Sequence, residues 1–193
     1  MKKEEKKKFW SKQNIVAMSI AFIMITSAIG YMWGKDIENV KYKEYSFSRG
    51  AGEWTLKFNK AKISFNYLPS EVEDINVSTE IITKLKGLIE IDTTSDENDS
   101  YSEIIAQAQY SMAQNLGLVS NTYLRLGMTS ENQFNLPVIT CKDATAAIPV
   151  LYFKKSNITE IDIKDNCITA KAKSEIDILR IKDRLLYGIL GII

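Results

Sequence analysis

The residues best suited to chemistry lie around the first of two cysteines, in the stretch Cys141-Lys142-Asp143-Ala144-Thr145. An acid, a base and a hydroxyl follow one another there in a run of small residues between two predicted strands. In one interpretation Lys142, Asp143 and Thr145 present a polar pocket at a strand end. In the other, which we favour, Asp and Thr cap a turn beside a disulfide, as these residue types do in many turns.

Cys141 and Cys167 are the two cysteines of the chain. In an exported domain an even cysteine count predicts a disulfide, and both residues adjoin strand-like segments, 137–140 and 168–171. A redox pair would need closer spacing, such as C-x-x-C, and a recognisable feature that lowers the pKa of one thiol. The sequence has neither, so it predicts one structural disulfide.

Several classes of site are excluded by composition. The chain has no histidine, which removes Ser-His-Asp and Cys-His catalysis and histidine-ligated metals. Two cysteines cannot complete a four-cysteine zinc site, the acidic run 96–99 lacks the spacing of a calcium loop, and no glycine-rich phosphate motif occurs. We therefore predict no catalytic residue, metal or cofactor. A serine–lysine hydrolase stays open, because no spacing singles out one pair.

Three N-x-S/T sequons occur, at Asn76, Asn98 and Asn157. Asparagines in this motif are glycosylated only where the segment is exported and the organism has the machinery. Asn98 lies in the polar stretch 93–100, which we predict to be a solvated loop, and is the most accessible of the three by this reasoning.

The charge of the chain is unevenly distributed. The whole sequence has 25 basic and 24 acidic residues, whereas residues 1–14 hold six lysines against two glutamates. The stretch 15–33 that follows contains no charged residue, and a helix of that length approaches the thickness of a bilayer's hydrocarbon core. Its few hydroxyl side chains, among them Ser19 and Thr26, can bond back to helix carbonyls. Tyr31 and Trp33 close the stretch as interfacial aromatics do.

These features predict a transmembrane signal anchor over residues 15–33, with the basic tail in the cytoplasm and the C-terminal part outside. A cleaved signal peptide is the alternative, since small residues occur at 26–30. The apolar stretch is longer than the usual core of a signal peptide, which favours a retained anchor.

Beyond the anchor we expect a juxtamembrane connection over residues 34–41 and one extracytoplasmic α+β domain over residues 42–193. Alternating segments 54–58 and 63–67 predict a hairpin with one buried aromatic face, and helices are expected near 78–86, 100–116 and 174–190. Ser174 and Asp177 have the spacing of a helix-capping pair. The expected architecture is one mixed or mainly antiparallel sheet with about three helices.

The sequence therefore predicts a single-pass membrane protein whose exported domain is a non-catalytic interaction or assembly module of the cell envelope. Its expected partners are the lipid bilayer, through residues 15–33, and an envelope or membrane protein, with no nucleic acid. The alternative is a membrane-tethered, histidine-independent hydrolase, and a thiol oxidoreductase is less favoured than either.

Overall fold

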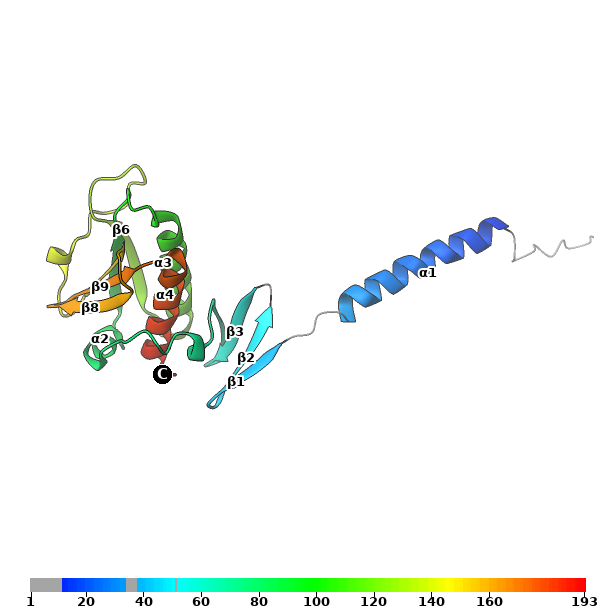
Figure 1. The fold of residues 1–193 in the computed structure, drawn as a ribbon, viewed down its shortest axis with the longest axis horizontal. Helices are drawn as coiled ribbons and strands as arrows, with labels where there is room; N and C mark the ends of the chain where they lie inside the picture. The colour runs from blue at the N-terminus through cyan, green and yellow to red at the C-terminus, as the bar shows by residue number, and fades with distance from the viewer. Residues whose placement is uncertain (1–11, 34–37, 51) are drawn as a thin grey trace, which may run out of the picture. The chain divides into compact units, whose positions relative to one another are not determined.

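Figure 1 presents the computed structural model of the chain, which describes residues 12–33, 38–50 and 52–193. The side chains of residues 12, 13 and 29–33 lie outside the described part. Residues 1–11 of the predicted basic tail and residues 34–37 of the predicted connection also lie outside it, and at the end of the predicted span only the backbone is described. The chain divides into two compact units, residues 1–38 and Asn39–Ile193.

In the first unit, helix α1 runs from Lys12 to Trp33. All its described side chains, residues 14–28, are exposed. The Ser19 hydroxyl donates to the Ile15 carbonyl at 3.0 Å and the Thr26 hydroxyl to the Phe22 carbonyl at 2.9 Å, as the sequence predicts. Within the described residues, no helix is both long enough and apolar enough to cross a membrane.

The second unit contains two sheets with helices between them (Figure 1). Sheet A is an antiparallel meander in the order β1-β2-β3-β4, and sheet B has the order β6-β5-β7-β9-β8. The elements of sheet A are β1 (Asn39–Tyr42), β2 (Tyr45–Gly50), β3 (Glu53–Phe58) and β4 (Ala61–Phe65), followed by η1 (Pro69–Glu71) and α2 (Thr79–Leu85). Those of the rest are β5 (Glu90–Ser95), α3 (Ser102–Val119), β6 (Tyr123–Met128), η2 (Cys141–Asp143), β7 (Val150–Lys155), β8 (Glu160–Lys164), β9 (Cys167–Ala172) and α4 (Glu175–Leu190).

The α+β class and the mixed strand directions are as predicted, but two sheets replace the single sheet expected. In sheet B, β6, β5, β7 and β9 are parallel, and only the edge strand β8 runs antiparallel, to β9. Helix α3 crosses from β5 to the parallel strand β6, as parallel pairs require. Strands β8 and β9 form an antiparallel hairpin, and β9 lies between β8 and β7, to which it is parallel.

The predicted loop 93–100 is wrong in its first three residues. Thr93, Thr94 and Ser95 belong to β5 and are buried. Their hydroxyls are satisfied inside the protein, since Thr93 donates to the Leu151 carbonyl and Thr94 to the Ile139 carbonyl. A polar sequence can therefore occupy a central strand, because the hydrogen bonds that burial removes from water are replaced by tertiary ones.

The core lies where the helical layer meets both sheets. The alternating residues of β3 and β4 point Leu56, Ile63 and Phe65 inward, as the predicted hairpin requires. The Tyr187 ring of α4 stacks on Phe65 with ring centroids 4.2 Å apart and meets Phe47 edge-on. Sheet A is thus packed against α4, whose opposite side covers β9.

Helix α4 is capped as the sequence predicts. The Ser174 hydroxyl accepts from the Asp177 amide at 3.2 Å and donates to the Asp177 carboxylate at 2.8 Å. Thr159 and Arg180 also donate to this carboxylate, and although burial opposes them, the net effect lowers the pKa of Asp177. Gly191 ends the helix in the left-handed conformation, with φ 74°.

A buried acid in α4 joins the end of sheet A to the helix. Asp183 is fully buried, and its Oδ2 accepts the backbone N–H groups of Asn66 and Tyr67 at 2.8 and 2.9 Å. Its Oδ1 lies 2.5 Å from the ammonium of Lys182, which is also fully buried. Burial raises the pKa of Asp183, against the opposing effect of Lys182 and the two amides. The Tyr187 hydroxyl donates to the Tyr67 carbonyl at 2.6 Å. Tyr67 is therefore bound to α4 through both its amide and its carbonyl.

We predict that Asp183→Ala lowers the free energy of unfolding by about 3–5 kcal/mol, because it leaves two amides without an acceptor and Lys182 buried without a counter-charge. Asp183→Asn should lower the free energy of unfolding by less, since the asparagine side-chain oxygen still accepts hydrogen bonds from the amides and burial already disfavours a charged carboxylate. The measurement is denaturant unfolding of the full chain in neutral detergent. The exposed control Glu131→Ala should change stability by less than about 0.5 kcal/mol.

The same variants give a pH test with a defined sign. Because the folded pKa of Asp183 is raised, its contribution to stability is complete below the unfolded pKa and is lost as pH rises through the folded pKa. Wild-type stability relative to Asp183→Asn should therefore fall as the pH rises above about 4. A relative stability that rises over this interval would contradict the assignment.

Candidate functional site

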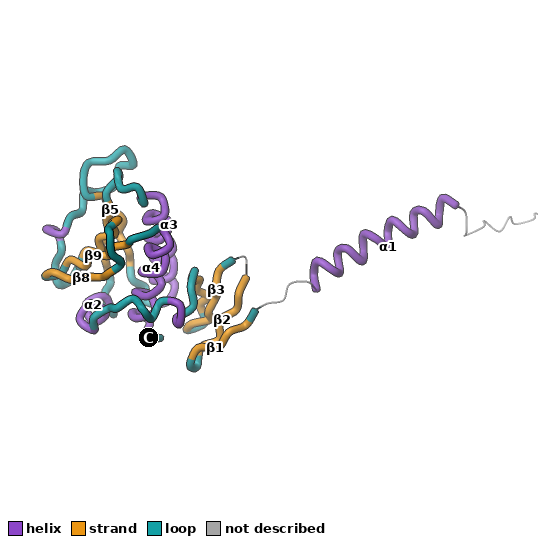
Figure 2. The backbone as a smooth tube through the Cα atoms, viewed as in Figure 1, coloured by secondary structure: helices purple, strands orange, loops and turns teal. Residues whose placement is uncertain are grey.

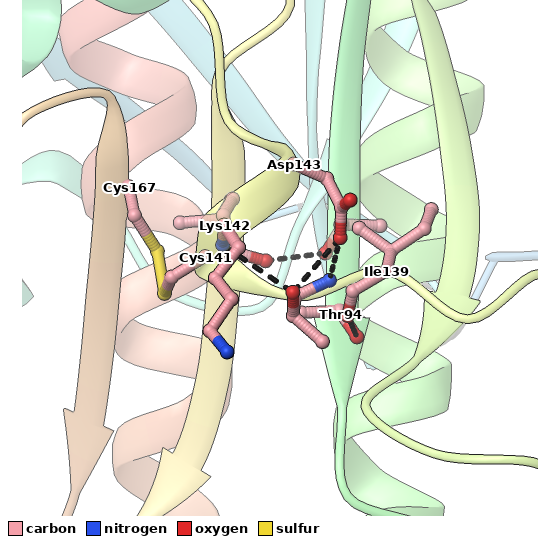
Figure 3. The surroundings of a disulfide bond; sticks show 9 residues. Thr94, Ile139, Cys141, Lys142, Asp143 and Cys167 are labelled. Carbon is pink, nitrogen blue, oxygen red and sulfur yellow. Dashed lines mark hydrogen bonds between the residues drawn. A yellow bond between two sulfur atoms is a disulfide. The ribbon is translucent and has the colours of Figure 1, made fainter.

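The predicted disulfide is present. Cys141 in η2 and Cys167 at the start of β9 are bonded, with their Cα atoms 5.2 Å apart (Figure 3). The bond joins the sheet to the segment 129–149 between β6 and β7, which runs as a loop apart from η2 (Figure 2). Cys167 is buried with Ile139 and Val150 in a small apolar cluster of its own.

The loop is fastened to sheet B by backbone contacts as well as by the disulfide. The strand predicted over residues 137–140 is reduced to an isolated bridge between Met128 and Val138. Gly127 makes this approach possible, because a Cβ there would lie 2.5 Å from Ile139 Cδ1 and 2.7 Å from the Pro137 carbonyl. The Ile139 carbonyl in turn accepts from Thr94 at 2.8 Å (Figure 3). The segment 129–149 therefore packs against sheet B beside β5 and β6.

The three residues of the predicted polar site make local hydrogen bonds. The Asp143 carboxylate accepts from the Thr140 amide and hydroxyl at 2.7 and 2.8 Å, which lowers the pKa of Asp143. Thr145 exchanges backbone and side-chain bonds with Ile148. Lys142 and Asp143 point to different sides of η2 in Figure 3. All three side chains are exposed and do not converge on one point, which is the turn-capping arrangement that we favoured from the sequence.

The strand order identifies another place where a site could form. The connection from β5 leads to β6 on one side of it, whereas β7 and β9 lie on the other, so the order reverses between β5 and β7. In open parallel sheets, ligands bind at the carboxyl ends of the strands at such a reversal. Here those ends are Ser95 and Lys155, and the segment 96–101 between β5 and α3 lies beside them.

Residues 99–101 and Lys155 form a contact cluster at this edge. Asp99 Oδ2 accepts from the Lys155 amide at 2.8 Å, and Asp99 Oδ1 from the Tyr101 amide at 2.8 Å. The Lys155 ammonium donates to the Ser100 hydroxyl at 3.0 Å and lies 4.9 Å from the centre of the Tyr101 ring. The hollow at this point has a volume of about 510 Å³ and is lined by Asp99, Ser100, Lys154, Lys155, Ser156 and Asn157.

The Ser100–Lys155 pair is the one serine–lysine hydrogen bond that the structure gives among the described residues. The sequence alone could not show whether a serine and a lysine lie together. Ser100 and Lys155 are far apart in the sequence, and the pairing of β5 with β7 brings them close. A lysine activates a serine when it is desolvated and so kept uncharged, whereas both side chains here are exposed. Both oxygens of Asp99 are already occupied by amides, so this cluster stabilises the edge of the sheet.

An ion pair between an exposed arginine of β6 and a buried acid of β5 lies elsewhere in sheet B. The Arg125 guanidinium binds the buried carboxylate of Asp92 through two bonds of 2.7 Å, and Glu90 lies 3.3 Å away. The hydrogen bonds to Asp92 raise the pKa of Arg125. This pair links β5 to β6 at directly opposed positions, and sequence reasoning missed it because the strand pairing was unknown.

Among the described residues, no group of three or more Cys, Asp or Glu is arranged to hold a metal ion.

The three sequon asparagines, Asn76, Asn98 and Asn157, are all exposed. Asn98 and Asn157 lie in the segments that follow β5 and β7, and Asn157 lines the hollow described above. Exposure therefore does not single out Asn98, which the sequence analysis expected to be the most accessible of the three.

Replacing both cysteines by alanine should lower the free energy of unfolding by about 3–4 kcal/mol, because a bond across 26 residues restricts the unfolded chain. Denaturant unfolding of the full chain with and without reductant measures this. Reductant should destabilise the wild type and leave the Cys141→Ala/Cys167→Ala variant unchanged. Equal unfolding midpoints for wild type and variant under oxidising conditions would show that the bond contributes nothing.

Comparison with known proteins adds no family: no family model, no curated protein and no solved structure matches the chain.

Proposed function

We propose that the chain is a single-pass membrane protein, anchored through residues 15–33, whose extracytoplasmic unit is a non-catalytic binding or assembly module of the cell envelope. The observation that carries the proposal is the charge-free stretch of 19 residues next to a tail with six lysines. Lysines on one side of such a stretch retain that side in the cytoplasm.

The form of α1 supports this anchor. Its exposed side chains include Val16, Phe22 and Met24, whose exposed fractions are 58%, 69% and 68%. Water is an unfavourable surrounding for so much apolar surface, and lipid is a favourable one. The hydroxyls of Ser19 and Thr26 already bond to helix carbonyls, so they add little cost in hydrocarbon. The Cys141–Cys167 disulfide is consistent with an oxidising compartment outside the membrane.

The non-catalytic part of the proposal rests on how the polar residues are used. At the carboxyl edge of sheet B, Asp99 binds backbone amides and Lys155 binds the Ser100 hydroxyl, while Asp143 caps a turn in the loop 140–148. A catalytic site would aim a nucleophile and a base at a common point. We therefore infer that the unit acts by binding an envelope or membrane protein through its surface.

The anchor is tested by alkaline extraction of membranes and by protease treatment of sealed vesicles. The full chain should stay in the membrane pellet, and protease added outside should digest the C-terminal unit while residues 1–14 stay protected. Ile20→Asp/Met24→Asp should move much of the chain to the supernatant, since each charge near the helix centre costs about 2.5–3.5 kcal/mol. Ile20→Leu/Met24→Leu is the matched control. A wild-type chain in the supernatant, or digestion of its N-terminus from outside, would refute the anchor.

A second candidate function, a tethered serine–lysine hydrolase, is favoured by the 3.0 Å contact between Ser100 and Lys155 at the strand-order reversal. A fluorophosphonate probe distinguishes the two functions, because it reacts with activated serines. We expect equal and low labelling of the wild type, Ser100→Ala and the neighbouring control Ser156→Ala. Labelling of the wild type that only Ser100→Ala abolishes would establish the hydrolase instead.

A further inference from the structure

The outer face of sheet A, turned away from α4, is a row of lysines beside a row of hydroxyl and amide side chains. Residues alternate between the faces of a strand, and Val40, Phe47, Leu56 and Ile63 occupy the inner face. The outer face therefore carries Lys41, Ser46, Lys57 and Lys62 in one row and Asn39, Ser48, Thr55 and Ser64 in the next, as the strand registers show. We call the first set the lysine row.

We propose that this outer face binds the anionic lipid headgroups of the membrane that holds residues 15–33. The inference rests on the proposed membrane anchor and deepens it, because it identifies the surface of the exported unit that faces the lipid.

The lysine row is electrostatically unfavourable within the fold itself. Lys57 and Lys62 are direct cross-strand partners. The Ser64 amide and carbonyl bond to the Asn115 side chain at 3.2 and 2.8 Å, away from β3. By alternation Lys62 also turns its backbone away from β3, so it forms a non-hydrogen-bonded pair with Lys57, in which side chains come closest. Like charges directly opposite each other destabilise a sheet.

In the described part of the chain, none of the ion pairs includes Lys41, Lys57 or Lys62. Glu53, the acid of β3 on this face, lines a hollow with Lys62 without forming an ion pair with it. All three side chains are exposed. A fold does not need adjacent lysines at these positions, whereas a surface that binds anions does. The arrangement is therefore better explained by an external anionic partner.

Two turns add further lysines at the same end of sheet A. The β1–β2 and β3–β4 turns lie together in a meander, and they contain Lys43 and Lys60 in the left-handed backbone region, with φ 50° and 71°. Glycine or asparagine would adopt that conformation at lower cost. Lys43 donates to the Ile192 carbonyl, and Lys60 is exposed. Glu44 is the acid within these two turns, and Glu73 contacts the Tyr42 hydroxyl beside them, so lysines outnumber acids at this end of the sheet.

The charge of the remaining chain has the opposite sign. Residues 39–65 contain six basic and two acidic residues, whereas residues 66–193 contain 12 basic and 18 acidic ones. Next to an anionic bilayer, sheet A would be attracted and the rest of the unit repelled. Anionic lipid is therefore a partner whose charge complements that of sheet A.

The test is lysine footprinting of the full chain reconstituted into vesicles of neutral phosphatidylcholine or of phosphatidylcholine with phosphatidylglycerol. Acetylation of Lys41, Lys57, Lys60 and Lys62, read by mass spectrometry, should slow about fivefold or more in the anionic vesicles and recover at high salt. The exposed lysines of the acidic part, Lys142, Lys164 and Lys173, should react equally in both. Equal reactivity of the lysine row in both lipids would overturn the proposal.

A variant pair separates binding from folding. Lys57→Gln/Lys62→Gln should reduce the protection of Lys41 and Lys60 in anionic vesicles, while its melting temperature in neutral detergent stays the same or rises because the repulsion is gone. Lys164→Gln/Lys173→Gln should leave the protection intact. Protection of Lys41 and Lys60 that persists in the first variant would contradict a shared lipid-binding face.

Flotation of the same vesicles distinguishes this inference from the anchor. A chain that floats with both lipids but has an unprotected lysine row refutes the lipid-binding face alone. A chain that floats with neither refutes the anchor as well. Duplex DNA, added to the detergent-solubilised chain as a soluble polyanion, should protect the row less than anionic vesicles do. Equal protection by DNA would assign the face to a soluble polyanion and overturn the lipid assignment.

Discussion

The carboxylate of Asp183 is the contact on which the arrangement of the second unit depends. It is buried in α4, yet it accepts the first two amides after β4, those of Asn66 and Tyr67. An amide buried without an acceptor costs about as much as a lost hydrogen bond, so the chain leaving sheet A is fixed at this helix. Burial raises the pKa of Asp183, and the Lys182 ammonium and the two amides oppose this effect.

With the end of β4 fixed, aromatic packing holds the rest of sheet A in place. Tyr187 lies one helical turn beyond Asp183 and stacks on Phe65, so the inner face of sheet A packs against α4. The outer face, with its lysine row, is then necessarily presented to the surroundings. The edge of β4 is covered in part by Asn115, which binds both backbone groups of Ser64. The inner face of sheet A is thus buried against the core, and its basic outer face is exposed.

Local patterns sufficed to predict some parts of the fold, and distant contacts were needed for others. The β3–β4 hairpin followed from alternation, the start of α4 from Ser174 and Asp177, and the disulfide from two cysteines near strands. The second sheet did not follow, because β5 ends in Thr93-Thr94-Ser95 and resembles a loop until Leu151 and Ile139 supply its hydrogen-bond acceptors. The Ser100–Lys155 contact was hidden for the same reason, since it exists only once β5 and β7 are paired.

The most direct test of this account is native-state hydrogen exchange of the full chain in neutral detergent. If Asp183 and Tyr187 unite sheet A with α4, the slowest amides of β3 and β4 should exchange only through the global opening that also exposes α4 and β7, with the same opening free energy. Exchange of all sheet A amides through a much smaller opening, while α4 and β7 stay protected, would contradict the account.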